Sequence, residues 1–492
     1  MKRKCLKGIA ILAGYIGLAV SAVAQTPAAA PSADALLRKL VEKGVLTDQE
    51  AKDILSESTQ TNLTASSASK WRISNAIKNI ELYGDLRFRY EYREAGNAPG
   101  AGSFNAGGAP TEDYMRERER MALRVGIRGD LYDDFYYGLR LETANNPRSP
   151  WVTFGEGGTQ GNPTPFAKDK FNLYLGQAYL GWRPFDWLEV TLGKMPMPLY
   201  TTPMVWDSDI SPEGAVEKLK FSAGPYVDLF ANFGQFVYQA YEPDLQVPTS
   251  DAFLLAWQLG TTVHLTKDIS LKAAPVLYNY TGYGQTNLLN QTFTGEGYQG
   301  VNVGLYTNYA TALHFNQNGL NNLLVLEVPA ELNFTVGKYG ARVFGDFAYN
   351  FEGNQRAEAA AQAAGPAILS HAYLGQDKAY QVGVGFGNLG LVYGTTSKRH
   401  TWEARAYFQH IEQYAEDVNM IDSDFFEGRA NLEGYYVALA YSITDGIIAT
   451  VRYGYANRIN KELGTGGNNQ DLPILNPIQN YHLVQLDVTW RF

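Results

Sequence analysis

The chain has 492 residues, enough for about three ordinary domains or for one large β-barrel. Its formal net charge of −9 argues against nucleic acid as a partner. Gly (49), Tyr (33) and Phe (23) are abundant, and no internal apolar run reaches the roughly 18 residues of a membrane-spanning helix. This combination is typical of a membrane barrel, whose strands dilute their hydrophobicity by alternation.

Residues 1–24 form a predicted signal peptide, so the chain is expected to be exported. A basic start precedes an apolar stretch over residues 9–20, and Ala22–Ala24 is a small-residue cleavage site before Gln25. The only cysteine, Cys5, leaves with the signal, and we therefore expect no disulfide in the mature chain.

Residues 25–70 form a predicted helical extension with a Ser/Thr linker. A short amphipathic helix over Ala33–Lys43 ends at Gly44, and a capping box at Thr47–Glu50 opens a second helix. Two short amphipathic helices cannot bury their apolar faces alone, which favours a periplasmic stem that self-associates or touches the cell wall. A spacer, or a lid folded against a barrel mouth, explains the same pattern equally well.

A barrel is predicted over residues 71–492, beginning with a strand over Ile80–Tyr92. In this strand, and in two more near 118–131 and from Phe135, apolar residues alternate with charged ones. The inward arginines of the three strands that we expect to line the lumen are Arg87, Arg89, Arg118, Arg120, Arg124 and Arg140. A charged face this regular must be wet, while the opposite face must meet something oily.

Thirteen further strands bring the predicted total to sixteen. They lie near 169–183, 187–195, 213–221, 225–237, 252–265, 269–280, 323–334, 340–351, 378–388, 400–411, 433–443, 446–456 and 481–492. The pattern at 213–221 is the weakest, because Lys218 and Lys220 blur its period, and loss of a strand pair would leave fourteen. The final strand alternates fully and ends on Trp490 and Phe492. An edge strand of a soluble sandwich is the alternative for that segment.

The predicted connections alternate in length along the chain. The short ones fall at 132–134, 184–186, 222–225, 266–268, 336–339 and 444–445, with a somewhat longer one at 389–399. The long ones fall near 95–115, 147–167, 196–212, 238–250, 281–322, 352–377, 412–431 and 457–480. Short turns at one end and long loops at the other, with an even strand number, indicate an all-β transmembrane antiparallel β-barrel. A barrel of about 16 strands leaves an aqueous channel.

The connection near 193–214 has an unusual composition for a solvent loop. It combines four prolines and three methionines with Trp206 and with the acidic residues Asp207, Asp209 and Glu213. Folded into the lumen, the loop would place Asp207 and Asp209 opposite or beside the arginine rows of the first three strands. The three acids would then form a constriction with a transverse field. The alternative is that the acids only satisfy the loop backbone.

Three segments resemble the putative porin family of Gram-negative bacteria. They are the run from GK at 193–194 to WDSDISPEG at 206–214, the first strand IELYGDLRFRYEYR, and the terminal aromatic strand. The resemblance covers about residues 71–492 and implies a sixteen-stranded outer-membrane channel, usually a homotrimer, that passes small hydrophilic solutes. A more distant resemblance links the chain to phosphate-selective porins. The acidic third long loop departs from their pattern, although the arginines keep an anion preference open.

The predicted function is passive diffusion of small hydrophilic solutes and ions through a water-filled pore in the outer membrane. No cofactor, metal site or catalytic group is expected. The six histidines are scattered without a nucleophile or an orienting group in any motif, which disfavours the alternative of a barrel enzyme. A further alternative is an adhesin or structural anchor that uses the long loops, above all 281–322.

Overall fold

The computed structural model describes residues 74–97, 113–144, 149–155, 171–240, 251–282, 320–364, 374–388, 398–461, 463–465 and 478–492. The chain divides into two compact units, residues 1–78 and 79–492. The predicted signal peptide and the helices of the extension lie outside the described residues.

The second unit is built on one antiparallel sheet of nineteen strands. They are β1 (Glu81–Asn97), β2 (Asp113–Asp130), β3 (Phe135–Ala144), β4 (Val152–Thr153), β5 (Asn172–Phe185), β6 (Leu188–Lys194), β7 (Glu213–Ser222), β8 (Val227–Gln239), β9 (Ala252–Thr266), β10 (Ile269–Ala273), β11 (Val276–Gly282), β12 (Leu324–Glu327), β13 (Ala330–Val336), β14 (Tyr339–Asn350), β15 (Lys378–Asn388), β16 (Trp402–Ile411), β17 (Leu432–Thr444), β18 (Ile447–Arg458) and β19 (Ile478–Arg491).

These nineteen segments make sixteen strands of a barrel wall, which confirms the predicted number. The segments β10 and β11 both pair with β9 and are one strand interrupted next to Pro275, and β12 and β13 are one strand interrupted at Pro329. Proline lacks the amide proton that the ladder needs, so the two interruptions fall where a proline stands. The two-residue β4 belongs to a loop and only extends the pairing of β2.

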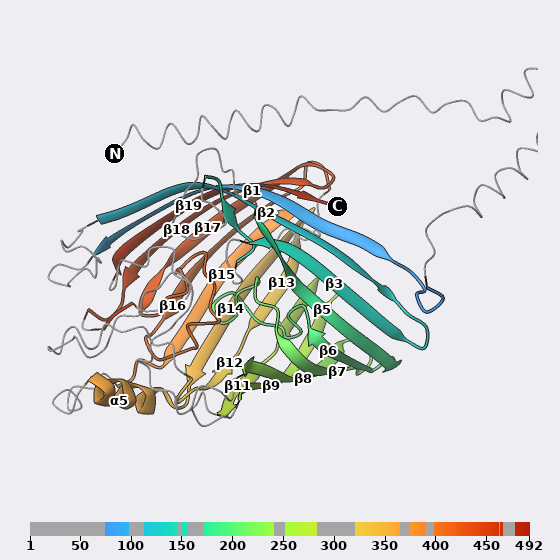
Figure 1. Ribbon diagram of the computed structural model, residues 1–492, viewed down its shortest axis with the longest axis horizontal. Coiled ribbons are helices and arrows are strands. Elements are labelled where there is room, and N and C mark those ends of the chain that lie inside the picture. Colours follow the sequence, from blue (N-terminus) through green and yellow to red (C-terminus); the bar gives the residue numbers. More distant parts are fainter. Residues whose placement is uncertain are drawn as a thin grey trace, which may run out of the picture. The chain divides into compact units, whose positions relative to one another are not determined.

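The first and last strands close the barrel. The strands β1 and β19 pair from Asp85 with Arg491 to Asn97 with Ile478. Below this ladder Gly84 and Phe492 exchange two backbone hydrogen bonds, of 2.9 and 3.1 Å. Figure 1 shows β1 between β2 and β19, at the junction of the blue and red ends of the sheet. The terminal alternating strand is therefore part of a closed wall, and the soluble-sandwich alternative is wrong.

The outer face of this wall is apolar. Exposed large side chains at alternate positions include Val382, Val384 and Phe386 on β15 and Val437 and Leu439 on β17. At the ends joined by short turns, rings stack in a belt, for example Phe185 on Trp187 at 5.3 Å. An apolar band edged by aromatic rings is the surface that a bilayer requires.

A helix occupies part of the connection predicted at 352–377. The helix α5 (Gly353–Ala364) buries Ala357 and Ala361. Its sequence is rich in alanine, the strongest helix former, a signal that the strand-based interpretation of this segment missed. No helix within the described residues has both the length and the hydropathy needed to cross a membrane.

Glycines under aromatic rings allow the lumen wall to pack closely. A Cβ atom at Gly181 would lie 1.9 Å from Cζ of Tyr136, whereas a Cβ atom at Gly385 would meet nothing closer than 4.0 Å. The ring of Tyr136 is held by a 2.7 Å hydrogen bond with Thr191 and by the guanidinium of Arg183 at 3.9 Å, so it cannot move aside freely.

We expect Gly181→Ala to destabilise the barrel by about 1–3 kcal/mol, because the added methyl overpacks the wall. Gly385→Ala is the matched control and should be neutral or slightly stabilising, because alanine loses less chain entropy than glycine on folding. The measurement is the thermal unfolding midpoint of each purified variant. Equal midpoints for the two variants would contradict the packing account.

Candidate functional site: two inward loops

The first inward loop, residues 195–212, lies inside the barrel. It joins β6 to β7 and buries Met195, Met204 and Trp206, which have at most 4% of their surface exposed. The Trp206 ring packs against Tyr278 of the wall at 6.4 Å. The apolar content of the loop explains why it packs against the inner face of the wall.

Polar contacts fasten this loop to the wall opposite β1. The amide of Tyr200 donates to Oε1 of Gln258 at 2.9 Å, and Nε2 of Gln258 donates back to the carbonyl oxygen of Tyr200 at 2.7 Å. The Thr201 hydroxyl donates to Glu327 at 2.7 Å, and the hydroxyl of Thr202 donates to Asp346. These contacts hold the turn of the loop against the inner face of the wall.

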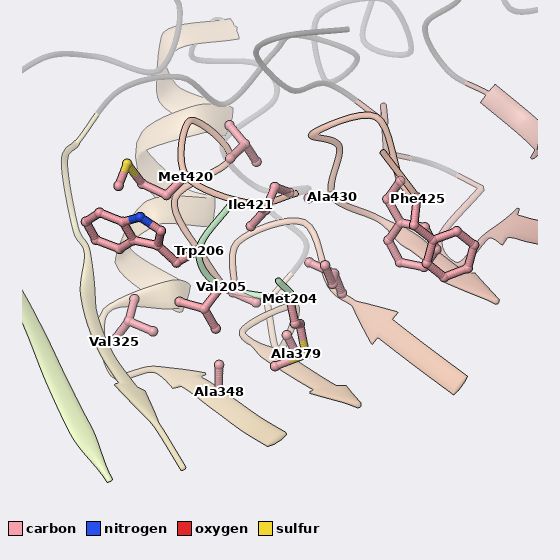
Figure 2. Packing of buried hydrophobic residues seen from close by; sticks show 14 of the residues in the cluster. Met204, Val205, Trp206, Val325, Ala348, Ala379, Met420, Ile421, Phe425 and Ala430 are labelled. Atoms are coloured by element: carbon pink, nitrogen blue, oxygen red, sulfur yellow. The ribbon is translucent and has the colours of Figure 1, made fainter. Parts of the chain in front are cut away.

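A second inward loop, residues 412–431, was expected to be an ordinary long loop. It buries Ile421, Phe425 and Phe426, and Figure 2 shows Met420 and Ile421 in one apolar cluster with Val205 and Trp206. A signal for it was present in the sequence. The tripeptide Asp422–Asp424 repeats the Asp-Ser-Asp of Asp207–Asp209, and each follows a run of apolar residues.

The two Asp-Ser-Asp tripeptides hold the loops together. The amide of Asp207 donates to the carbonyl oxygen of Met420 at 2.6 Å. The amide of Asp422 donates to the carbonyl oxygen of Pro203 at 3.0 Å. One carboxylate oxygen of Asp207 accepts from the amide and the hydroxyl of Ser423, at 3.1 and 3.0 Å. We call this set of contacts the loop junction.

Burial sets the titration of the acids in the junction. It raises the pKa of Asp207, with the nearby carboxylates of Asp209 and Asp422 adding to the effect. Burial, together with Asp424, raises the pKa of Asp422 to about 7. Since these folded-state pKa values exceed the ordinary aspartate value, the stability that these groups contribute is full at low pH. Ionisation of Asp422 removes part of it as the pH rises through about 7.

The predicted acidic set is divided by the structure. Asp207 is only 5% exposed and serves the loop junction. Asp209 forms an ion pair with Arg124 on the inner face of β2. Burial alone would raise the pKa of Asp209, but Arg124 and Arg87 lower it below its usual value. Glu213 lies apart, on the outer face of β7 with a 61% exposed side chain, where it pairs with Lys194.

The six predicted lumen arginines all lie on the inner face, and most of them are buried in ion pairs. Arg118 and Arg120 gather around the carboxylate of Glu91, which is 0% exposed. Arg89 donates to Asp487 at 2.8 and 3.0 Å and to Asp424 of the second inward loop at 2.9 Å.

The remaining lumen arginines are more open. Arg140 lies 3.1 Å from Glu142, and Arg87 pairs with Asp85 and keeps 26% of its side chain exposed. Of the six predicted lumen arginines, Arg87 therefore has the most exposed side chain.

A cavity of about 200 Å³ remains between the loops and the wall. Asp207–Asp209 and Asp422–Asp424 line one side, and Arg87, Arg405 and Arg452 line the wall side. Arg405 on β16 and Arg452 on β18 were missed, because a single arginine within a strand carries no pattern of its own. Within the described residues, no group of three or more His, Cys, Asp or Glu side chains is arranged to hold a metal ion.

The loop junction predicts that Asp207→Ala will loosen both loops, because Ser423 then loses its acceptor inside the barrel. A buried donor left without a partner costs about 1–3 kcal/mol. Amide hydrogen exchange of residues 199–212 and 419–425 should therefore accelerate about tenfold or more at constant pH. Glu213→Ala, which removes an exposed acid outside the junction, is the control. Unchanged exchange in Asp207→Ala would contradict the junction.

Comparison with known proteins agrees with this architecture. The family model described as "Putative porin" matches residues 69–492. Among curated proteins, none matches the chain. Three similar solved structures are one titled "Asymmetric conductivity of engineered proteins" and a triple and a quintuple mutant of Rhodopseudomonas blastica porin. Each is 12% identical with a TM-score of 0.36, over 84% of this chain and 100% of that chain. Because the family model spans nearly the whole barrel, this chain belongs to the putative porin family and is an outer-membrane porin.

Proposed function

We propose that small hydrophilic solutes and ions cross this porin by passive diffusion, along the space between the two inward loops and the inner faces of β1, β16 and β18. The observation that carries the proposal is the charged cavity left open where both loops meet the wall. A barrel of sixteen strands has room for an aqueous channel, and the loops narrow it. The family and the fold indicate a channel rather than an enzyme.

Within this passage the charges are proposed to act across a short gap. Asp209 and Asp424 come from the two loops, with 18% and 33% of their side chains exposed, and Arg87 and Arg452 face them from the wall. Fixed opposite charges in a narrow space with low-dielectric walls produce a strong local field. Asp207 and Glu213 of the predicted acidic set are left out of this passage, because Asp207 serves the loop junction and Glu213 lies on the outer face. Asp424 takes their place beside Asp209.

The charge proposal predicts a change of ion selectivity in the double variant Asp209→Asn with Asp424→Asn. Removing two negative charges leaves Arg124 and Arg89 with less compensation, so the anion-to-cation permeability ratio should rise severalfold. The measurement is the reversal potential of single channels in a planar bilayer under a salt gradient.

Glu213→Gln is the matched control for the selectivity measurement and should leave the reversal potential unchanged. An unaltered reversal potential in the double variant would remove these acids from the passage. Absence of stepwise openings from correctly folded wild-type protein would overturn the diffusion proposal itself.

A homotrimer is proposed from a polar patch on the outer face. The strands β6 and β7 are short, with 7 and 10 residues, and their outer faces carry Lys194 paired with Glu213. On the same face Glu217 accepts a 3.0 Å hydrogen bond from Gln235 of β8. Charged side chains that face lipid are destabilising. A contact with further copies of this chain would remove the patch from lipid, in agreement with the resemblance.

The patch predicts that Glu217→Arg will dissociate the oligomer, because it reverses the charge at the centre of the proposed contact. Leu439→Arg, on the outer face of β17, adds the same group elsewhere and should leave the oligomer intact. Light scattering in mild detergent measures the mass of each variant. Retention of the wild-type mass by Glu217→Arg would count against this interface.

The N-terminal segments complete the proposal. We infer that residues 1–24 are cleaved on export and that residues 25–70 form a periplasmic stem, for which the basic-apolar-small pattern and the sequence signals of two short helices are the support. A deletion of residues 25–70 that changed neither oligomer size nor attachment to the cell wall would remove the stem and leave the spacer or the lid.

A further inference from the structure

The cavity beside the loop junction has an arginine-rich lining. Five guanidinium groups border it, from Arg87, Arg89, Arg120, Arg405 and Arg452. Four carboxyl groups oppose them, but the oxygens of Asp207 already accept from the amide of Asp209 at 2.9 Å and from Ser423. Guanidinium groups thus outnumber carboxyl groups in the lining, and four of them also pair with carboxylates of the wall: Arg87 with Asp85, Arg120 with Glu91, and Arg89 and Arg452 with Asp487. Arginine suits a carboxylate in particular, because its planar fork can donate two parallel hydrogen bonds.

Aromatic rings form a second part of the same lining. Tyr407 and Tyr436 stack at 4.9 Å with an interplanar angle of 24°, and Phe344 meets Tyr407 edge-on at 6.2 Å. The guanidinium of Arg405 lies 5.6 Å from the centre of the Tyr436 ring. In the same lining the Trp151 ring lies 4.0 Å from the guanidinium of Arg89. Aromatic rings and arginines thus border one space together.

The cavity is large enough for a small solute. Its volume is about 200 Å³. A cavity of about 150 Å³ accommodates one benzene ring in another protein. The space beside the junction is therefore large enough for one six-membered ring with a carboxylate.

We propose that this cavity is a binding site for small monocarboxylates that carry a planar ring, of the benzoate class, on their way through the pore. The carboxylate pairs with Arg405 and its neighbouring arginines, while the ring lies against Tyr407. This inference rests on the proposed function and narrows it to a preferred class of solute. A simple carboxylate such as acetate satisfies the arginines alone, and a ring with a positive charge is repelled by them.

The test is block of the ionic current by benzoate in single channels of the full-length protein. Acetate and benzylammonium, each at the same concentration and ionic strength, serve as the comparison solutes. We expect benzoate to interrupt the current at a concentration at least about tenfold lower than acetate, because stacking on aromatic rings adds to the carboxylate contact. Benzylammonium should not block at the concentrations that suffice for benzoate.

Two variants separate the parts of the site. Arg405→Gln should weaken block by benzoate and by acetate alike, by about tenfold, because it removes a charge-assisted contact from both. Tyr407→Leu should weaken block by benzoate and leave acetate unchanged. Arg183→Gln is the matched control, since Arg183 also lies over a tyrosine, Tyr136 at 3.9 Å, but does not border the cavity.

The outcomes distinguish this inference from the proposed function. Equal block by benzoate and acetate in an otherwise conducting channel overturns the ring-specific site and leaves passive diffusion in place. The same follows if Arg183→Gln weakens block as much as Arg405→Gln does. A folded protein that never conducts overturns the proposed function first.

Discussion

Inside a bilayer no water is present to hydrogen-bond the backbone groups at the edges of a β-sheet. The pairing of β1 with β19 satisfies these groups by joining the two edges. The ladder runs from Asp85 with Arg491 to the loop end of both strands, and the double hydrogen bond between Gly84 and Phe492 extends it to the C-terminal residue. Once the wall is closed, alternation sends apolar side chains to lipid and charged ones to the lumen. The inner charges of the barrel are thus a consequence of closure as much as of function.

Those inner charges also fix the loops. Glu91 and Asp487 are fully or nearly buried, and a buried carboxylate is tolerable only when cations and hydrogen bonds compensate it. Arginines of β1, β2 and β18 supply that compensation, and Arg89 extends it to Asp424 on the second inward loop. The first inward loop is tied to the second through Asp207 and Ser423 and to β2 through Asp209 and Arg124. One connected set of ion pairs and hydrogen bonds therefore positions both loops relative to β1 and β2.

The sequence was sufficient for the wall, because a strand pattern repeated sixteen times outweighs any one ambiguous segment. Even the strand near 213–221 is present, with its lysines on the inner face. The site was predicted only in part. Period 2 located the arginines of β1–β3, and composition revealed the first inward loop. Which acid faces which arginine depends on contacts between residues far apart in the chain, such as Arg124 with Asp209 and Arg89 with Asp424, 85 and 335 positions apart, and no local pattern encodes them. The helix α5 was missed because its alanines lay within an expected loop.

The most direct test of this account is whether the current passes the two loops. The only cysteine of the chain is Cys5 in the predicted signal, so a single Ser208→Cys substitution gives one reactive thiol at the exposed tip of the first inward loop, beside the cavity. We predict that labelling this thiol with a bulky reagent lowers single-channel conductance sharply, whereas labelling Leu439→Cys on the outer face leaves it unchanged. Full labelling of Ser208→Cys without any fall in conductance would show that the passage runs elsewhere, and would contradict the account.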